Sequence, residues 1–251
     1  MTDSTLLFVG HSHIIAIEDA WQARQKAGSA PWRASFLQLR LPDFRPDLTQ
    51  AQDSPAFWSA AARAVMDAAA PDHVLSCIAG DMPAGMALVE HPQPFDFILD
   101  SAPELPVDES RQILPCALIE ALMRMKMRAG MQTMRALKQA FKVPMSHLLA
   151  PPPVPSADFI ARFPGASRER LQIHGSSPAV LRYKLWLMQA RITEELCTEL
   201  GIDLLPVPPQ TRDEAGYLVE RAWKDGTHGN MWYGRQVLRQ LERHLRRVET
   251  T

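Results

Sequence analysis

The sequence has almost no net charge and no long hydrophobic run. Its 251 residues carry 27 basic and 28 acidic side chains, which gives a formal charge of −1 at pH 7. This balance argues against binding to nucleic acid or to an anionic membrane through bulk electrostatics. No segment approaches the roughly 18 consecutive apolar residues of a membrane-spanning helix, so we expect no membrane span. The 46% hydrophobic content excludes full-length disorder and indicates a soluble globular protein.

Cysteine is scarce, and no targeting or cofactor motif is present. The three cysteines, Cys77, Cys116 and Cys197, form no C-x-x-C pair, so neither a disulfide framework nor a zinc knuckle is indicated. The N-terminus lacks the charged and apolar regions of a signal peptide. The absence of GxxxxGK[ST] and GxGxxG motifs disfavours nucleotide cofactors. We therefore expect reduced, buried thiols, a cytoplasmic location, no cofactor and no bound metal.

Five short apolar runs are bounded by glycine or proline and separated by helical patterns. Several are continuous rather than alternating, which is typical of strands that are covered on both faces. The predicted strands are 6–9, 35–40, 73–79, 143–150 and 202–207, with a further short strand at 95–99. The predicted helices are 13–27, 55–70, 115–141, 178–200 and 230–247.

The helix boundaries carry their own signals. Ser177 is a suitable N-cap for the fourth helix, with proline following it, and Gly201 falls just past its end. Ser54 followed by proline is the same start signal for the second helix. Strands that alternate with helices predict a parallel sheet with helices on both faces. We interpret residues 1–251 as a single α/β domain, with an irregular proline-rich excursion at about 81–114.

Reactive side chains follow the first and third predicted strands, and another group precedes the last helix. In a doubly wound sheet, ligands bind outside the carboxyl ends of the strands, so these segments are predicted to meet at one edge. The three segments are Gly10-His11-Ser12-His13, Gly80-Asp81 and Asp225-Gly226-Thr227-His228-Gly229-Asn230.

Ser12 lies where the first strand turns into a helix. The helix N-terminus behind it offers backbone N–H groups and a dipole that favour an oxyanion. If Asp225 orients the imidazole of His228, that ring can act as a general base for Ser12. Each feature also has a simpler interpretation: Ser12 as an N-cap, Asp225 as a capping residue and His228 as a surface residue.

The combination resembles the SGNH/GDSL hydrolase superfamily: Gly-x-Ser follows the first strand, and Asp-Gly-x-His lies near the C-terminus. The segment DGTHGNMWYG, from Asp225 to Gly234, is similar to the final block of that family. The resemblance implies a three-layer α/β/α sandwich with a flavodoxin-like five-stranded sheet, and ester or acyl-group hydrolysis without a metal. By matching position it implies that Ser12 is the nucleophile, His228 the base and Asp225 its orienting partner.

Two blocks depart from the family pattern. The chain has His11 where the family has Asp, and Asp81 follows Gly80 where the family supplies an Asn to the oxyanion hole. An ionised carboxylate there would repel an oxyanion, whereas a protonated one could donate to it. The resemblance implies that five further residues surround the oxyanion or the substrate. They are Gly80, Asp81, His11, His13 and Asn230.

We therefore predict a serine hydrolase that acts on a small acyl ester, with an O-acetyl group on a carbohydrate as one such substrate. The departures leave two alternatives. One is a binding or regulatory protein with this fold and impaired catalysis. The other is a metal-assisted hydrolase, since histidine nitrogens and carboxylate oxygens suit zinc. The residues available to such a metal are His11, His13, Asp81, Asp225 and His228.

Overall fold

A parallel sheet of five strands forms the centre of the computed structural model, which describes residues 4–78 and 86–248. The strand order is β2-β1-β3-β6-β7, the order of flavodoxin-like doubly wound sheets. The predicted α/β architecture and parallel sheet are thus confirmed. The strands are β1 (Thr5–Gly10), β2 (Arg33–Gln38), β3 (His73–Cys77), β6 (Met145–Leu148) and β7 (Asp203–Leu205).

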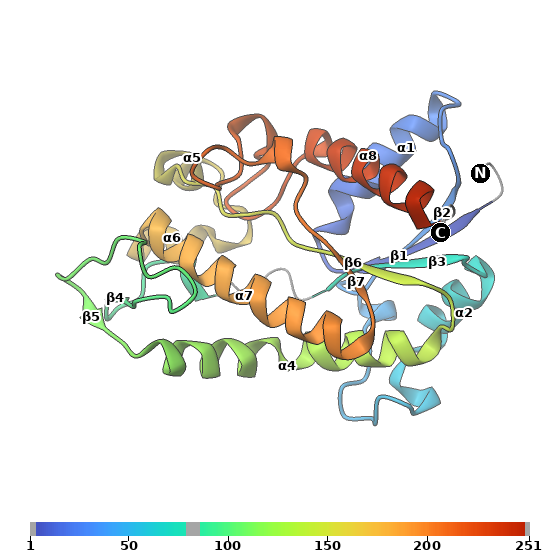
Figure 1. Ribbon diagram of the computed structural model, residues 1–251, viewed down its shortest axis with the longest axis horizontal. Helices are drawn as coiled ribbons and strands as arrows, with labels where there is room; N and C mark the ends of the chain where they lie inside the picture. The colour runs from blue at the N-terminus through green and yellow to red at the C-terminus, as the bar shows by residue number, and fades with distance from the viewer. Residues whose placement is uncertain (1–3, 79–85, 249–251) are drawn as a thin grey trace.

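Helices cover both faces of the sheet, which confirms the predicted three layers (Figure 1). On one face lie α1 (Ile14–Lys26) and α8 (Met231–Val248). On the other lie α2 (Ala60–Ala69), α4 (Cys116–Ala140) and α7 (Ala179–Leu200). The remaining short elements are α5 (Ala157–Arg162), α6 (Arg168–His174) and the 3-10 turns η1 (Pro42–Phe44), η2 (Pro55–Phe57), η3 (Gly165–Ser167), η4 (Pro209–Thr211) and η5 (Glu220–Ala222).

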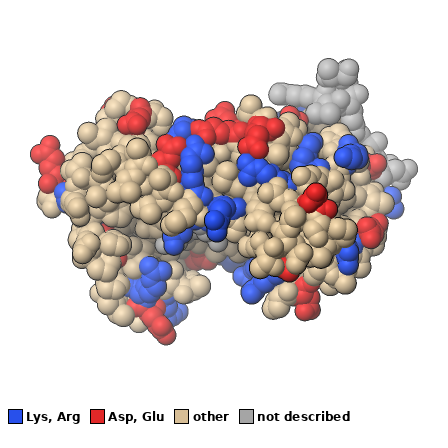
Figure 2. Space-filling view, turned by 90° about the horizontal axis from the view of Figure 1, so that it is seen from below, with Lys and Arg blue, Asp and Glu red and all other residues tan. Residues whose placement is uncertain are grey.

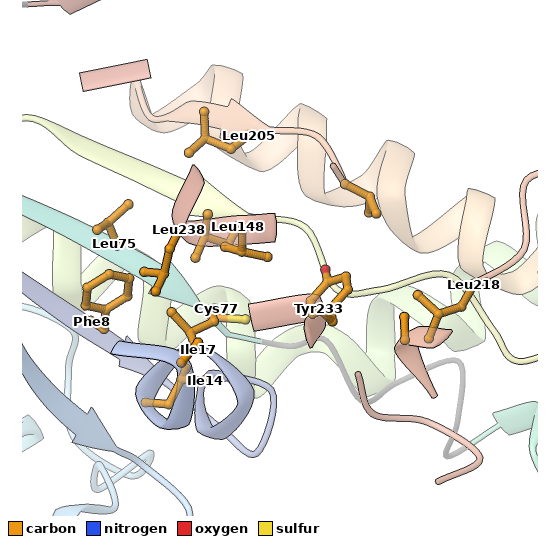
Figure 3. Packing of buried hydrophobic residues seen from close by; sticks show 14 of the residues in the cluster. Phe8, Ile14, Ile17, Leu75, Cys77, Leu148, Leu205, Leu218, Tyr233 and Leu238 are labelled. Carbon is orange, nitrogen blue, oxygen red and sulfur yellow. The ribbon is translucent and has the colours of Figure 1, made fainter. Parts of the chain in front are cut away.

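Alternate side chains of the central strand β1 enter two different hydrophobic clusters. Leu6 and Phe8 point toward α1 and α8, where they pack with residues such as Ile17 and Leu238 (Figure 3). Leu7 and Val9 point to the opposite face, toward α2, α4 and α7. Because both faces are buried, the strand reads as a continuous apolar run instead of an alternating one. This is why the sequence pattern located it.

One predicted helix start is wrong, and a second helix starts within one residue of its predicted position but without the predicted cap. The Ser54-Pro55 signal opens η2, in which the Ser54 hydroxyl accepts the N–H of Ala56 at 3.2 Å. The helix itself begins later, and the Ser59 hydroxyl accepts the N–H of Ala62 at 3.0 Å. At the other site the Ser177 hydroxyl donates to the carbonyl of Ala87, so Ser177 does not cap α7. A Ser-Pro pair therefore marks a turn without specifying the type of element that the turn begins.

The described part of the proline-rich excursion is attached to α7 by a buried ion pair. It contains β4 (Phe95–Asp96) and β5 (Gln112–Ile113), which pair in parallel, so the predicted strand at 95–99 is shorter than expected. The Lys184 ammonium donates to the Asp96 carboxylate and to the Phe97 carbonyl, each at 2.8 Å. Lys184 is fully buried, and a charge in that position is tolerated only when it is paired.

The three cysteines are free. Cys77 and Cys197 are buried, as expected, whereas Cys116 at the start of α4 is partly exposed. Burial raises the pKa of the Cys77 and Cys197 thiols to about 12, so both are unreactive at neutral pH. No helix within residues 4–78 and 86–248 has the length and apolar character needed to cross a membrane.

Helix α8 approaches α1 closely through Gly234. A methyl group at this position would overlap the carbonyl oxygen of Ala16, a backbone atom that cannot rotate away. We predict that Gly234→Ala lowers the free energy of unfolding by about 1–3 kcal/mol, as overpacking does elsewhere, even though alanine favours helix over glycine. Urea unfolding measures the change.

Arg235→Ala, at the exposed neighbouring position of α8, is the matched control and is expected to be nearly neutral. Equal stability of the Gly234→Ala variant and the wild type would contradict a close contact between the two helices.

Candidate active site

Ser12 lies at the carboxyl end of β1, beside β3, where the strand order of the sheet reverses direction. Gly10 ends β1, and a side chain there would clash with Ile14 and with the carbonyl oxygen of Cys77 on β3. The backbone N–H of His11 donates to that same carbonyl at 3.3 Å. Glycine is therefore required for the chain to turn tightly into α1, and this turn presents Ser12 at the edge where doubly wound sheets bind ligands.

Asp225 and His228 belong to a turn between η5 and α8 that holds itself together. The carboxylate oxygen Oδ1 of Asp225 accepts the backbone N–H groups of Thr227 and His228, both at 2.9 Å. The N–H of Lys224 donates to the carbonyl of His228 at 3.0 Å. These hydrogen bonds span only a few residues, and they place the Asp225 carboxylate beside the His228 imidazole.

The structure brings the side chains of Ser12, His228 and Asp225 together in one hydrogen-bonded chain. The Ser12 hydroxyl Oγ lies 2.7 Å from His228 Nε2. On the other side of the ring, His228 Nδ1 lies 2.9 Å from each carboxylate oxygen of Asp225. With a proton on Nδ1, the ring donates to Asp225, and its Nε2 can accept the hydroxyl proton of Ser12. In this arrangement the ring is placed to take a proton from the hydroxyl.

The carboxylate of Asp225 is stabilised in its ionised form. Burial acts to raise its pKa, but the hydrogen bond with His228 and those from the backbone N–H groups outweigh burial. The net effect lowers the pKa from 3.8 to about 2. Asp225 is therefore a permanent negative charge at neutral pH, suited to stabilising an imidazolium on His228.

Thr227 is a member of this site that sequence reasoning missed. Its hydroxyl Oγ1 lies 3.1 Å from Asp225 Oδ1 and 2.9 Å from His228 Nδ1. The only signal in the sequence was its position between the two residues of the Asp-x-x-His pattern. We assign Thr227 a positioning role, since its hydroxyl contacts both partners.

The two histidines that flank Ser12 have different surroundings. His13 occupies the N-cap position of α1 and is buried, with its ring centroid 4.9 Å from that of His228. It therefore limits how the His228 ring can tilt. His11 is partly buried and lines a cavity between the loop after β2 and helix α4. His13 thus lies beside the His228 imidazole, and His11 lies beside the cavity.

The side chain of Asn230 makes four hydrogen bonds with the backbone around the start of α8. Its side-chain amide donates to the carbonyls of Arg221 and Trp223, at 2.8 and 3.1 Å. Its side-chain oxygen accepts the N–H groups of Trp232 and Tyr233, at 2.9 and 3.2 Å. The side-chain oxygen thus caps α8, and the amide nitrogen holds the segment before it. The predicted contact of Asn230 with the oxyanion or substrate stays a prediction.

Two further predicted residues, Gly80 and Asp81, lie outside the described residues. Their predicted place in the oxyanion hole therefore stays a prediction. Within the described ranges, no group of three or more His, Cys, Asp or Glu side chains is arranged to hold a metal ion. His11, His13 and His228 thus do not form the ligand set of a metal-assisted hydrolase with described carboxylates.

Comparisons with known proteins show similarity in structure alone. No protein-family model matches the chain, and no curated protein matches it in sequence. The periplasmic domain of a lipopolysaccharide acetyltransferase from Salmonella ser. Paratyphi A is similar in structure, with a TM-score of 0.50 and 11% identity over 96% of this chain and 84% of that chain. A GDSL-like lipase from Bacteroides thetaiotaomicron has a TM-score of 0.43 and 11% identity over 97% of this chain and 88% of that chain.

The similarity to the acetyltransferase domain and the strand order define the fold. The chain has an SGNH hydrolase-like fold: a parallel five-stranded sheet between two helical layers, with Ser12 after the first strand and Asp225 and His228 before the last helix. A structural similarity at 11% identity shows the fold without showing the activity.

The lowered pKa of Asp225 predicts a pH-dependent contribution to stability. Because its folded-state pKa lies below the ordinary 3.8, the carboxylate stabilises the fold above about pH 4, and this contribution is lost as the pH falls toward 2. We predict that Asp225→Asn lowers the free energy of unfolding by about 2 kcal/mol at pH 7 and that the difference shrinks below pH 4.

Urea unfolding at a series of pH values measures this difference. Asp19→Asn, at an exposed position of α1, is the control and is expected to differ little from wild type. A constant gap between Asp225→Asn and wild type from pH 7 to pH 2 would show that the charge of Asp225 is not what stabilises the turn.

Proposed function

We propose that the protein is a serine hydrolase of the SGNH type that cleaves small acyl esters. The observation that carries the proposal is the unbroken chain from Ser12 Oγ through both nitrogens of His228 to the Asp225 carboxylate. A capping serine and a surface histidine need no such contact. The chain also lies at the edge of the sheet where this class of fold binds ligands.

The reaction proceeds in two halves. In the first, Ser12 Oγ attacks the ester carbonyl while His228 Nε2 takes its proton, and the Asp225 carboxylate stabilises the imidazolium. The tetrahedral intermediate collapses, His228 protonates the leaving alcohol, and an acyl group remains on Ser12. In the second, His228 takes a proton from water, the hydroxide attacks the acyl-serine, and the carboxylic acid leaves as Ser12 regains its proton.

The oxyanion of each tetrahedral intermediate needs hydrogen-bond donors. We assign the backbone N–H of Ser12 to this task, since it precedes the first turn of α1 and shares the favourable field of the helix N-terminus. Gly80 and Asp81 are the proposed partners across the site. A protonated Asp81 would act as a donor in place of the Asn that it replaces in the family pattern.

The proposal includes the molecule that accepts the acyl group from the acyl-enzyme. Water gives a hydrolase, whereas a sugar hydroxyl in the same position gives an acyltransferase with unchanged roles for Ser12 and His228. The structural similarity to a domain described as a lipopolysaccharide acetyltransferase supports testing both acceptors. We propose water as acceptor and a small acyl ester, such as an O-acetylated carbohydrate, as donor.

A fluorophosphonate probe tests the nucleophile directly. We expect covalent labelling of the wild type, loss of labelling in Ser12→Ala, and a fall in the rate of p-nitrophenyl acetate hydrolysis of about 10⁴-fold or more. Mass spectrometry of the labelled protein locates the modified residue.

Ser146→Ala is the matched control because Ser146 also contacts histidine side chains, with its Oγ 2.9 Å from His73 Nε2. Ser146 Oγ lies 3.3 Å from His244 Nε2, but the Asp203 carboxylate contacts that same nitrogen at 3.7 Å, so no relay through the ring exists there. We expect Ser146→Ala to keep its labelling. Equal labelling of wild type and Ser12→Ala would disprove the assigned nucleophile. A folded wild type that neither reacts nor hydrolyses would favour a binding or regulatory protein.

A further inference from the structure

A cavity with basic walls adjoins the residue that precedes Ser12. It has a volume of about 390 Å³ and lies between the loop after β2 and helix α4. Its apolar floor includes Leu39 and Met127, and His11 forms part of the wall. Three cationic side chains also line it: Arg40, Arg45 and Lys126.

Some basic residues of α4 are neutralised by carboxylates, whereas Arg128, like the three cavity cations, forms no ion pair with a described residue. On the same helix, Arg124 and Arg135 are paired with glutamates of α7, with N–O distances of 2.5 and 2.8 Å. Figure 2 shows such basic and acidic side chains beside each other on the face that contains α4. None of the three cavity cations forms an ion pair with any residue in 4–78 or 86–248.

The cavity carries a local excess of positive charge on a chain whose net charge is only −1. Arg45 also donates to the carbonyl oxygen of Arg40, at 3.3 Å from Nε and 3.2 Å from Nη2, which holds the two arginines in one loop. Unneutralised cations gathered at a concave surface favour a negatively charged ligand, because low-dielectric walls concentrate their field. Guanidinium groups in particular match carboxylate and phosphate oxygens.

The position of the cavity relates it to the proposed reaction. His11, which forms part of the cavity wall, is the residue before Ser12, the proposed nucleophile. The Cα atoms of two consecutive residues lie about 3.8 Å apart. His11 and Ser12 lie at the carboxyl end of β1, and the backbone N–H of Leu39 on the cavity floor donates to the carbonyl of Gly10 at 2.8 Å. The wall of the cavity thus begins one residue from the proposed nucleophile.

We propose that this cavity is a subsite for the anionic group of the substrate, so that the enzyme prefers acyl esters bearing a carboxylate, phosphate or sulfate group. The inference rests on the proposed function, which supplies the ester hydrolysis. Arg40 and Lys126 supply the selectivity for an anionic substrate. The apolar floor contacts the carbon skeleton next to the anionic group, and the cations neutralise the charge.

Matched esters test the preference. 4-Acetoxybenzoate and methyl 4-acetoxybenzoate carry the same acetyl group and differ by one negative charge on the alcohol. Mono-p-nitrophenyl glutarate and p-nitrophenyl butyrate share a leaving group and differ by a charge on the acyl chain. For the preferred pair, we expect Arg40→Gln and Lys126→Gln each to lower the charged-to-neutral ratio of kcat/KM about five- to tenfold, chiefly through KM.

Lys142→Gln is the control, since Lys142 is an exposed cation near the opposite end of the sheet, just before β6. We expect it to leave the ratio unchanged. A fall confined to one pair of esters identifies whether the anionic group belongs to the alcohol or to the acyl chain. An unchanged ratio in both pairs, or an equal fall with Lys142→Gln, would overturn the proposed subsite while leaving Ser12-dependent hydrolysis intact.

Binding without turnover separates this proposal from the proposed function. Calorimetry with 4-acetoxybenzoate and with mono-p-nitrophenyl glutarate is carried out on Ser12→Ala and on the Ser12→Ala, Lys126→Gln double variant. Binding of either anion that weakens about five- to tenfold in the double variant supports the subsite, even if the wild type hydrolyses neither ester. Equal binding by both variants, or no binding of either anion, overturns it.

Discussion

The packing of α1 against α8 is the constraint on which the site depends. Ser12 lies two residues before the start of α1, and His228 lies three residues before the start of α8. The separation of the two helices therefore affects the distance between the Ser12 hydroxyl and the His228 imidazole. That distance is 2.7 Å, although the two residues are 216 positions apart in the chain. Gly234 allows the two backbones to approach at the Ala16 carbonyl, where any side chain would force them apart.

Charged residues have three different roles in this protein. At Asp225, convergent hydrogen bonds overcome burial and keep a carboxylate ionised beside His228. At Lys184 and Asp96, a buried ion pair joins the excursion to α7 without any solvent-facing atom on the lysine. Around the basic cavity, by contrast, no described carboxylate neutralises Arg40 or Lys126. The Lys184–Asp96 pair thus holds the structure together, and the cations that line the cavity face the space where a ligand fits.

The sequence located the strands to within a few residues. Burial on both faces makes β1 a continuous apolar run, whereas the edge strand β2 is partly exposed and lies at Arg33–Gln38 instead of 35–40. The sequence was less successful where one residue type suits two environments. The Ser54-Pro55 pair opens a 3-10 turn as readily as a helix. Arg40 and Lys126 gave no signal, since nothing in their spacing indicates that a loop and a helix form one cavity.

By itself, the sequence determined the alternation of strands and helices, the tight turn before Ser12 and the Asp225–His228 turn. These features follow from periodicity and from hydrogen bonds that span only a few residues. Only the tertiary structure decided that Ser12 reaches His228, that Thr227 contacts both of its neighbours' side chains, and which cations gather beside His11. Contacts between distant segments depend on which apolar faces of the helices and the sheet pack together. That packing is determined by the burial of apolar surface over the whole chain, which no short segment specifies.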